Sequence, residues 1–200
     1  MPAYNFKITF KDRPEDEFAS ADVTKKGGQV IWMLYNRDVG QETLDVDKVK
    51  EIGREFLESR GYKSMKDTYY VKEDSTATVN YAYEQDGVVV YPDLIKVKIA
   101  LDNGEIVGFE SKGYIMNHTE RDIPEPKFTE EEIKSNFMAK RELKAVGLAI
   151  IPTNFGTEIF CYELKGNFNG KDFLVYVNAE TGREEQVLII INTPEGILTL

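Results

Sequence analysis

The stretch VKIALDNGEIVGFESKGYIMNH, Val97–His118, decides the fold. Apolar residues alternate along its first half, VKIAL, as in a strand with one buried face. The dipeptide Asn103-Gly104 follows and predicts a type I′ hairpin turn, after which apolar residues resume in IVGF. These apolar side chains cannot carry acid–base or nucleophilic chemistry, so the stretch predicts a structural β-hairpin.

The same pattern occurs three times along the chain, in SADVTKKGGQVIWML, KVKIALDNGEIVGFE and LVYVNAETGREEQVL. The turn glycines are Gly28, Gly104 and Gly182, separated by 76 and 78 residues, and an aliphatic residue lies five positions before each. Glycine supplies the positive φ that tight turns require. Such a constant period indicates a repeated unit.

Two of the three hairpins are preceded by a helical pattern. The segment LDVDKVKEIGREFLESRGY has apolar residues at helical spacing, with Asp45 as its N-cap. The segment FTEEEIKSNFM begins with a capping box formed by Thr129 and Glu132. We expect four apolar side chains of these helices to be buried against their sheets: Ile52, Phe56, Ile133 and Phe137.

Alternating segments after each helix predict four antiparallel strands per repeat. In the second repeat they are 66–72, 76–85, 88–101 and 105–112, and in the third 145–152, 158–168, 171–178 and 185–192. Asp86-Gly87 and Asn169-Gly170 are further hairpin signals. The first repeat shows only strands, at 4–11 and 19–34, with no helix before them.

These patterns predict an α+β protein of tandem repeats, each with one helix packed on a four-stranded antiparallel sheet. The predicted domains are 1–42 for a helix-less part of the first repeat, 43–122 for the second and 123–200 for the third. One helix covers one face of its sheet, so apolar residues on the other face need a neighbouring repeat or a partner. A chain that begins within a strand pattern also predicts that these 200 residues belong to a longer polypeptide.

Composition excludes several classes of function. The chain has 35 acidic and 25 basic residues, and its net charge of −10 argues against binding of nucleic acid or of anionic lipid. No apolar run reaches the length of about 18 residues that spans a membrane, and the start lacks the apolar core of a signal peptide. The one cysteine, Cys161, cannot form a disulfide within the chain and leaves the compartment open.

Residues able to do chemistry are few and scattered. His118, the single histidine, starts a polar linker, where we expect a solvated side chain and no catalytic or metal-binding role. Cys161 lies in an alternating strand, where a small buried hydrophobe is expected. Paired carboxylates could support glycosidic acid–base chemistry or weak calcium binding, but they fall where helix caps and turns explain them: Asp45/Asp47, Glu130–Glu132 and Glu184/Glu185. We therefore predict no enzyme, no metal site and no cofactor.

Five tyrosines crowd the middle of the chain: Tyr69, Tyr70, Tyr81, Tyr83 and Tyr91. Exposed tyrosines could form a partner surface or stack on sugars, whereas tyrosines in strands more often form half-buried cross-strand pairs. Binding of peptidoglycan through surface aromatics is therefore an alternative function.

Longer stretches resemble a known family. YPDLIKVKIALDNGEIVGFESKGYIMNH, LAIIPTNFGTEIFCYELKG and FLVYVNAETGREEQVLIIINTPEGILTL resemble the C-terminal region of the YpeB family of spore germination proteins. DVTKKGGQVIWMLYNRDV resembles the preceding repeat of that family. The repeats are similar to PepSY domains, small modules of a helix and an antiparallel sheet. The resemblance covers essentially the whole chain.

The resemblance implies a non-enzymatic protein of the dormant endospore. Its PepSY domains would bind and stabilise or inhibit the cortex-lytic enzyme SleB, a peptidoglycan lytic transglycosylase. It also implies an N-terminal membrane anchor outside this sequence and a location on the outer face of the inner spore membrane. No catalytic, cofactor-binding or metal-binding residue follows from it, and it leaves the partner-binding residues and the oligomeric state open.

Overall fold

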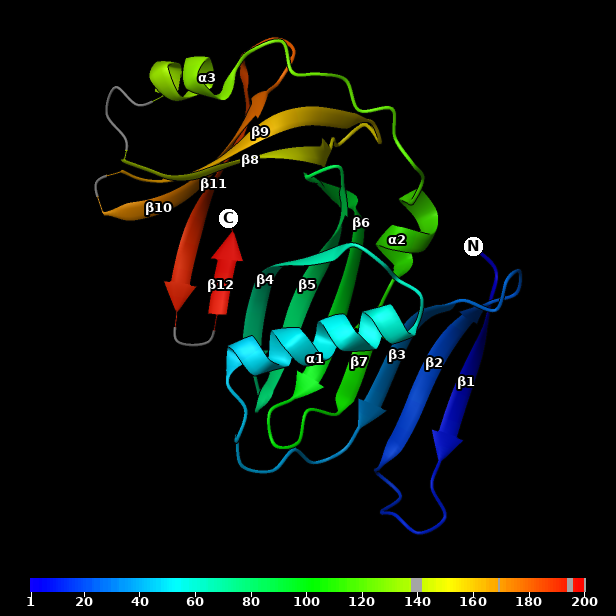
Figure 1. The fold of residues 1–200 in the computed structure, drawn as a ribbon. Helices are drawn as coiled ribbons and strands as arrows, with labels where there is room; N and C mark the ends of the chain where they lie inside the picture. The colour runs from blue at the N-terminus through cyan, green and yellow to red at the C-terminus, as the bar shows by residue number, and fades with distance from the viewer. Residues whose placement is uncertain (138–141, 169, 194–195, 200) are drawn as a thin grey trace. The chain divides into compact units, whose positions relative to one another are not determined.

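The computed structural model describes residues 1–137, 142–168, 170–193 and 196–199, which form two compact units. The first comprises Met1–Tyr83 and Asp93–His118, and the second Glu84–Pro92 and Thr119–Leu200. The predicted α+β class is confirmed, with strands predominating (Figure 1). The division into three repeats at 42 and 122 stays a prediction. The two compact units are defined by contacts between residues, whereas the repeats are defined by the period of the sequence, so the units do not test the repeat boundaries. In the described part of the chain, the helices are all too short or too polar to cross a bilayer.

The first unit is an antiparallel sheet with one long helix on it. Its strands run in the order β1-β2-β3-β7-β6-β5-β4, and Figure 1 shows α1 lying across one face. The elements are β1 Ala3–Thr9, β2 Phe18–Thr24, β3 Val30–Asn36, α1 Val46–Ser59, β4 Met65–Glu73, β5 Thr76–Gln85, β6 Val88–Ala100, β7 Ile106–Glu110 and α2 Lys112–Asn117.

The second unit also combines a sheet with one helix, but its sheet has fewer strands and its helix is shorter. Its strands run β12-β11-β10-β9-β8, and the tip of β6 pairs parallel with β8 through Val88–Val90 and Leu148–Ile150. The elements are α3 Glu130–Phe137, β8 Glu142–Pro152, β9 Glu158–Phe168, β10 Lys171–Asn178, β11 Glu184–Thr193 and β12 Gly196–Thr199. Strand β12 and helix α2 were not predicted, and Asn169 of the expected Asn169-Gly170 turn lies outside the described residues.

The three predicted hairpins share one turn geometry. Each ladder shifts register at the aliphatic residue five positions before the turn glycine, between Asp22/Val23, Lys98/Ile99 and Tyr176/Val177. Equivalent backbone N–H groups then donate across the turn, from Thr24 to Gln29 (2.8 Å), Ala100 to Glu105 (2.9 Å) and Asn178 to Arg183 (2.8 Å). The sequence period therefore corresponds to a repeated backbone conformation.

The expected type I′ turn at Asn103-Gly104 is wrong. Gly104 has a φ of +81°, but Asn103 is not among the residues with positive φ, as a type I′ turn would require. The register shift inserts an extra residue, and the Asn103 side chain accepts the backbone N–H of Glu105 at 2.9 Å. At Asp86-Gly87 both φ angles are positive, +52° and +81°, so the predicted hairpin signal there is confirmed.

Helix α1 begins and packs largely as its sequence predicts. The Asp45 carboxylate accepts the N–H of Lys48 at 2.8 Å, which confirms the N-cap. The line of α1 residues that is fully buried consists of Val49, Gly53 and Leu57. Ile52 and Phe56 flank that line, half-buried against the core. The sheet side of this core comprises Met65, Ala77, Val79, Tyr81, Ile95, Val97, Ile99, Leu101 and Phe109.

Helix α3 starts with the predicted capping box. The Glu132 carboxylate accepts the N–H of Thr129 at 2.8 Å, and the Thr129 hydroxyl accepts the N–H of Glu132 at 3.2 Å. Ile133 is fully buried, as expected. It packs in a core with Tyr162, Leu164, Val175, Val177 and Ala179. The side chain of Phe137 lies outside the described residues.

A bidentate ion pair fixes the loop between β3 and α1 to the β6–β7 turn. Both terminal nitrogens of Arg37 donate to the Asp102 carboxylate at 2.9 Å, and the N–H of Gly40 donates to it at 2.9 Å. The Arg37 and Asp102 side chains are 10% and 18% exposed. The hydrogen bonds from Arg37 hold the pKa of Asp102 well below its usual range. The ion pair therefore joins strands of the first predicted repeat to the hairpin of the second.

Replacing Asp102 by asparagine should lower the free energy of unfolding by about 1–2 kcal/mol at pH 7, since charge-assisted hydrogen bonds are lost near the surface. Because the pKa of folded Asp102 is lowered, its contribution is complete above the unfolded pKa of about 3.9 and is lost as pH falls through the folded pKa. Urea unfolding of both proteins at pH 7, 5 and 3 should show the difference shrinking at the lowest pH. Asp38→Asn, an exposed change of the same charge, is the control. An equal loss in the free energy of unfolding for Asp102→Asn and Asp38→Asn would contradict a stabilising role of the ion pair between Arg37 and Asp102.

Candidate interaction surface

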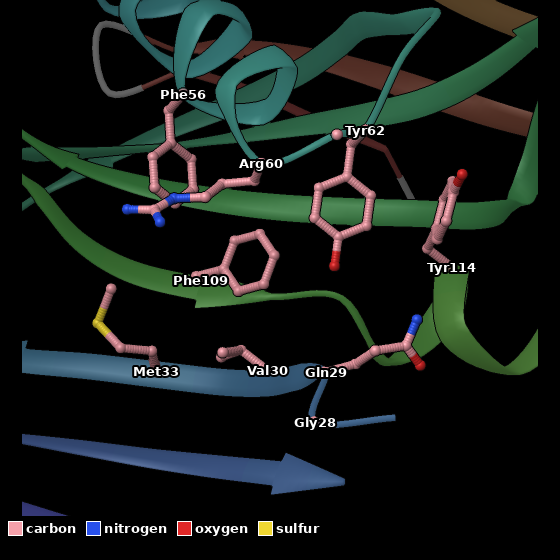
Figure 2. Close-up of a pocket in the computed structure, with 10 residues that line it drawn as sticks. Gly28, Gln29, Val30, Met33, Phe56, Arg60, Tyr62, Phe109 and Tyr114 are labelled. Atoms are coloured by element: carbon pink, nitrogen blue, oxygen red, sulfur yellow. The ribbon is translucent and has the colours of Figure 1, made fainter. Parts of the chain in front are cut away.

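A hollow of about 600 Å³ opens in the first unit beside the end of α1 (Figure 2). Val30 and Met33 of β3 form one side, and Phe109 of β7 lies between them and α1. The rest of the lining comes from the β2–β3 turn, the end of α1 and α2: Gly28, Gln29, Phe56, Arg60, Gly61, Tyr62 and Tyr114. Three segments distant in sequence, 28–33, 56–62 and 109–114, therefore meet at one surface.

The wall of the hollow is a chain of aromatic rings. Phe109 contacts Phe56 edge-on at a centroid distance of 5.7 Å, and it contacts Tyr62 in a tilted arrangement at 5.9 Å. Tyr62 contacts Tyr114 edge-on at 5.0 Å. Edge-on aromatic pairs of this kind add about 0.5–1.5 kcal/mol each beyond burial. The wall is thus held by ring packing that ties α1 and α2 to β7.

His118 and Asp93 complete this aromatic chain. The His118 ring stacks on Tyr114 at 4.1 Å and meets Tyr83 edge-on at 4.7 Å. Its Nδ1 lies 2.7 Å from the carboxylate of Asp93, whose side chain is fully buried. The expectation of a solvated His118 is therefore wrong, because α2 carries its ring onto Tyr114. The ring contacts both Tyr114 and Tyr83, with Asp93 at its Nδ1.

The hollow has the chemistry of a binding surface for an apolar group. Aromatic and aliphatic side chains provide its walls, and the Arg60 guanidinium lies over the Phe56 ring at 5.4 Å. Arginine at the rim offers hydrogen bonds to a carboxylate or a backbone carbonyl. Within the described residues, no three histidine, cysteine or carboxylate side chains come together as metal ligands.

A second apolar surface lies in the second unit. Val187, Ile189 and Ile191 alternate along β11 and are 44%, 41% and 37% exposed. Val187 pairs with Val175, a core residue beneath α3, so this β11 stripe continues the helix-covered face of its sheet. Contiguous exposed apolar residues of this kind mark interaction sites more often than single ones.

The carboxylates singled out in the sequence lie at three separate element starts. Asp45 caps α1, with Asp47 in its first turn. Glu132 closes the capping box of α3, and Glu130 pairs with Lys134 one turn later. Glu184 begins β11, where Glu185 accepts a hydrogen bond from the Asn178 side chain at 2.8 Å. The structure brings none of the three groups together, and each is accounted for by local structure.

The cysteine and the tyrosines are also structural. Cys161 is buried, and burial raises the pKa of its thiol to about 12, so it is a poor nucleophile at neutral pH. Tyr81 is fully buried, and its hydroxyl donates to the carbonyl of Lys50 at 2.8 Å. Tyr91 is half-buried and donates to Glu163 at 2.6 Å. The remaining three, Tyr69, Tyr70 and Tyr83, are half-buried in β4 and β5. None of the five is an exposed platform for sugars.

Sequence reasoning missed Tyr62 and Tyr114, which line the hollow, and Asp93, which contacts the His118 ring. The spacing of Tyr114 and His118, four positions apart, was a usable signal, because such residues stack on one side of a helical turn. Asp93 gave no local signal, since its partner lies 25 residues away.

Comparison with known proteins identifies the family. The model for "YpeB sporulation, PepSY1 and PepSY2 domains" matches residues 1–124. The chain belongs to the YpeB sporulation protein family. Sporulation proteins YpeB of Halalkalibacterium halodurans and Bacillus subtilis are 36% and 32% identical to it, each over 91% of this chain and 41% of the relative.

A solved structure of the same family has the same fold. The Bacillus megaterium YpeB C-terminal domain matches with a TM-score of 0.81 and 26% identity, over 95% of this chain and 90% of that one. The chain spans about two fifths of the length of the curated YpeB relatives it matches.

Proposed function

We propose that this chain is a non-enzymatic binding module of a spore protein, which holds the cortex-lytic enzyme SleB and stabilises or inhibits it in the dormant spore. The observation that carries the proposal is membership of the YpeB sporulation family, through a family model over residues 1–124 and relatives at 32–36% identity. In the longer protein, an N-terminal anchor would place the module on the outer face of the inner spore membrane.

The side chains support a binding role more than a chemical one. The ring of the single histidine contacts Asp93 and stacks on Tyr114, and the single cysteine is buried. The apolar hollow and the β11 stripe offer surfaces that a protein partner can cover. Peptidoglycan binding through the central tyrosines loses support, because those tyrosines are buried or half-buried.

The test is size-exclusion chromatography of this chain with purified SleB, with muropeptide release from cortex assayed in the same fractions. We expect co-elution together with slower release or with slower loss of SleB on storage. Separate elution with unchanged activity and unchanged storage stability would contradict the proposal for these 200 residues. Muropeptide release by this chain alone would contradict its non-enzymatic character.

Two variants of β11 then locate the contact. Ile189→Asp places a charge in the exposed β11 stripe, whereas Gln186→Asp places one on the opposite face of the same strand. Weaker co-elution for Ile189→Asp alone assigns the stripe to the interface. Equal co-elution for both variants moves the contact to another surface of the module.

A further inference from the structure

Strand β1 exposes a stripe of large apolar side chains. Tyr4, Phe6 and Ile8 are 55%, 48% and 49% exposed, and their alternation with polar neighbours places all three on one face of the strand. In the described residues β1 is also an end strand of its sheet, so its outer backbone groups have no strand beside them. Soluble proteins seldom leave an apolar edge strand open, because it invites pairing.

Backbone hydrogen bonds identify the counterparts of these residues in the other repeats. The N–H groups of Lys25, Leu101 and Ala179, at one repeat position, donate to the carbonyls of Pro2 (3.0 Å), Ser75 (2.9 Å) and Phe160 (3.0 Å). Counted from these bonds, Tyr4 corresponds to Ala77 and Tyr162, and Phe6 to Val79 and Leu164. The strand registers agree, since Tyr4 pairs with Val23 as Tyr162 pairs with Val177.

These counterparts are core residues covered by a helix. Ala77 and Val79 are fully buried in the cluster that α1 completes. Tyr162 and Leu164 are 5% and 2% exposed, in the cluster that Ile133 of α3 completes. The same positions are about half exposed only in the repeat that shows no helix among the described residues.

The turn glycines show the same difference. A Cβ at Gly104 would lie 2.8 Å from Ile52 and 3.3 Å from Leu44, and one at Gly182 would lie 3.1 Å from Phe128. Leu44 and Phe128 each directly precede the first capping residue of a helix. A Cβ at Gly28 would meet nothing within 4 Å, and the hollow described above opens beside it. The hollow therefore occupies the place that an apolar residue before a helix fills in the other repeats.

The exposed face of β1 is continuous with the core under α1. Cross-strand pairs run from Phe6 to Ala21, from Ala21 to Met33 and from Met33 to Phe109. Phe109 is buried and contacts Phe56 of α1. A helix placed over β1–β3 would therefore lie on the same side of the sheet as α1 and extend the same apolar layer.

We propose that this face is the binding site of an amphipathic helix and a following edge strand, supplied by the polypeptide that precedes this stretch in a longer protein of the YpeB family. In the other repeats the helix cap, Asp45 or Thr129, lies 31 or 32 residues before the counterpart of Ala3, with one strand between them. The curated relatives extend well beyond the matched region, so the family polypeptide has the length to supply such a segment. The inference is independent of SleB binding.

Cysteine accessibility tests the proposal directly. Phe6→Cys lies on the proposed binding site and Lys7→Cys on the opposite face of the same strand, while Cys161 is buried. Labelling rates with a thiol reagent are compared in the 200-residue chain and in the chain extended upstream by about 40 residues of the family polypeptide. We expect the extension to slow labelling at position 6 at least tenfold and to change position 7 less than threefold. Equal rates at position 6 in both forms would overturn the proposal.

A charge in the binding site gives a second readout. Phe6→Glu should lower the urea midpoint of the extended form and leave that of the 200-residue chain nearly unchanged, because Phe6 is half exposed there. The same midpoint shift in both forms would overturn the proposal. Protection of position 6 that rises with the concentration of the 200-residue chain would assign the binding site to a second copy and also overturn it. These readouts need no SleB, so a failure here leaves the proposed function untouched.

Discussion

Gly53→Ala should lower the free energy of unfolding by about 2–4 kcal/mol, although alanine is the better helix former by about 1 kcal/mol. Gly53 lies in the middle of α1, where a Cβ would be 2.1 Å from the Tyr81 hydroxyl oxygen and 2.8 Å from its ring carbon Cζ. Tyr81 is fully buried and donates to the carbonyl of Lys50 at 2.8 Å, so its ring cannot retreat without losing that bond. Overpacking of about 1–3 kcal/mol and a lost buried hydrogen bond outweigh the gain in helix propensity.

Urea unfolding monitored by circular dichroism and by the single tryptophan, Trp32 of β3, measures this loss. Removing the hydroxyl gives the sharpest control, since Gly53→Ala should cost less in a Tyr81→Phe background than in the parent. Gly147→Ala is the matched control, because its Cβ would meet nothing within 4 Å and the residue has no positive φ. A Gly53→Ala protein as stable as the parent would show that α1 can move away from β5.

The elements that sequence predicted are those whose signals are local. The caps at Asp45 and Thr129, the helical apolar spacing and the repeated turn glycines depend on neighbours within a few residues. The buried face of α1 was predicted less well. The large apolar side chains of Ile52 and Phe56 were expected to be buried, but α1 approaches the sheet most closely at Gly53. That approach depends on Tyr81, whose ring reaches α1 from another strand, and local periodicity cannot show it.

Helix α2 and the hollow were also missed because they depend on contacts between residues distant in sequence. The six residues of α2 include a glycine and have no side-chain cap, so propensity gives no helix there. Tertiary contacts hold it instead: the Ser111 hydroxyl donates to the carbonyl of Val30 at 2.6 Å, and the Ser111 N–H donates to that of Ile31 at 2.8 Å. The hollow exists only after β3, α1, β7 and α2 have met, which is why no single segment of sequence indicated it.

Asp93→Ala should lower the free energy of unfolding by about 2–4 kcal/mol, because it removes a buried carboxylate that fixes the His118 ring. Asp93 is fully buried, 2.7 Å from His118 Nδ1, and the His118 ring in turn stacks on Tyr114. The near-ultraviolet circular dichroism should also weaken, since Tyr62 and Tyr114 lose their fixed edge-on arrangement. Asp12→Ala, at an exposed carboxylate, should stay within about 0.5 kcal/mol of the parent.

A double-mutant cycle separates the contact between Asp93 and His118 from the general cost of emptying a buried site. His118→Ala removes the contact between the His118 ring and the buried Asp93 carboxylate, and a lost hydrogen bond to a buried polar group costs about 1–3 kcal/mol. The double variant should therefore lose less than the sum of the single losses, because each single variant already removes the contact between the two side chains. Additive losses would mean that the two side chains act separately. In that case the contact between Asp93 and His118 would not set the position of Tyr114, and the edge-on pair of Tyr62 and Tyr114 would keep its near-ultraviolet signal in the Asp93→Ala variant.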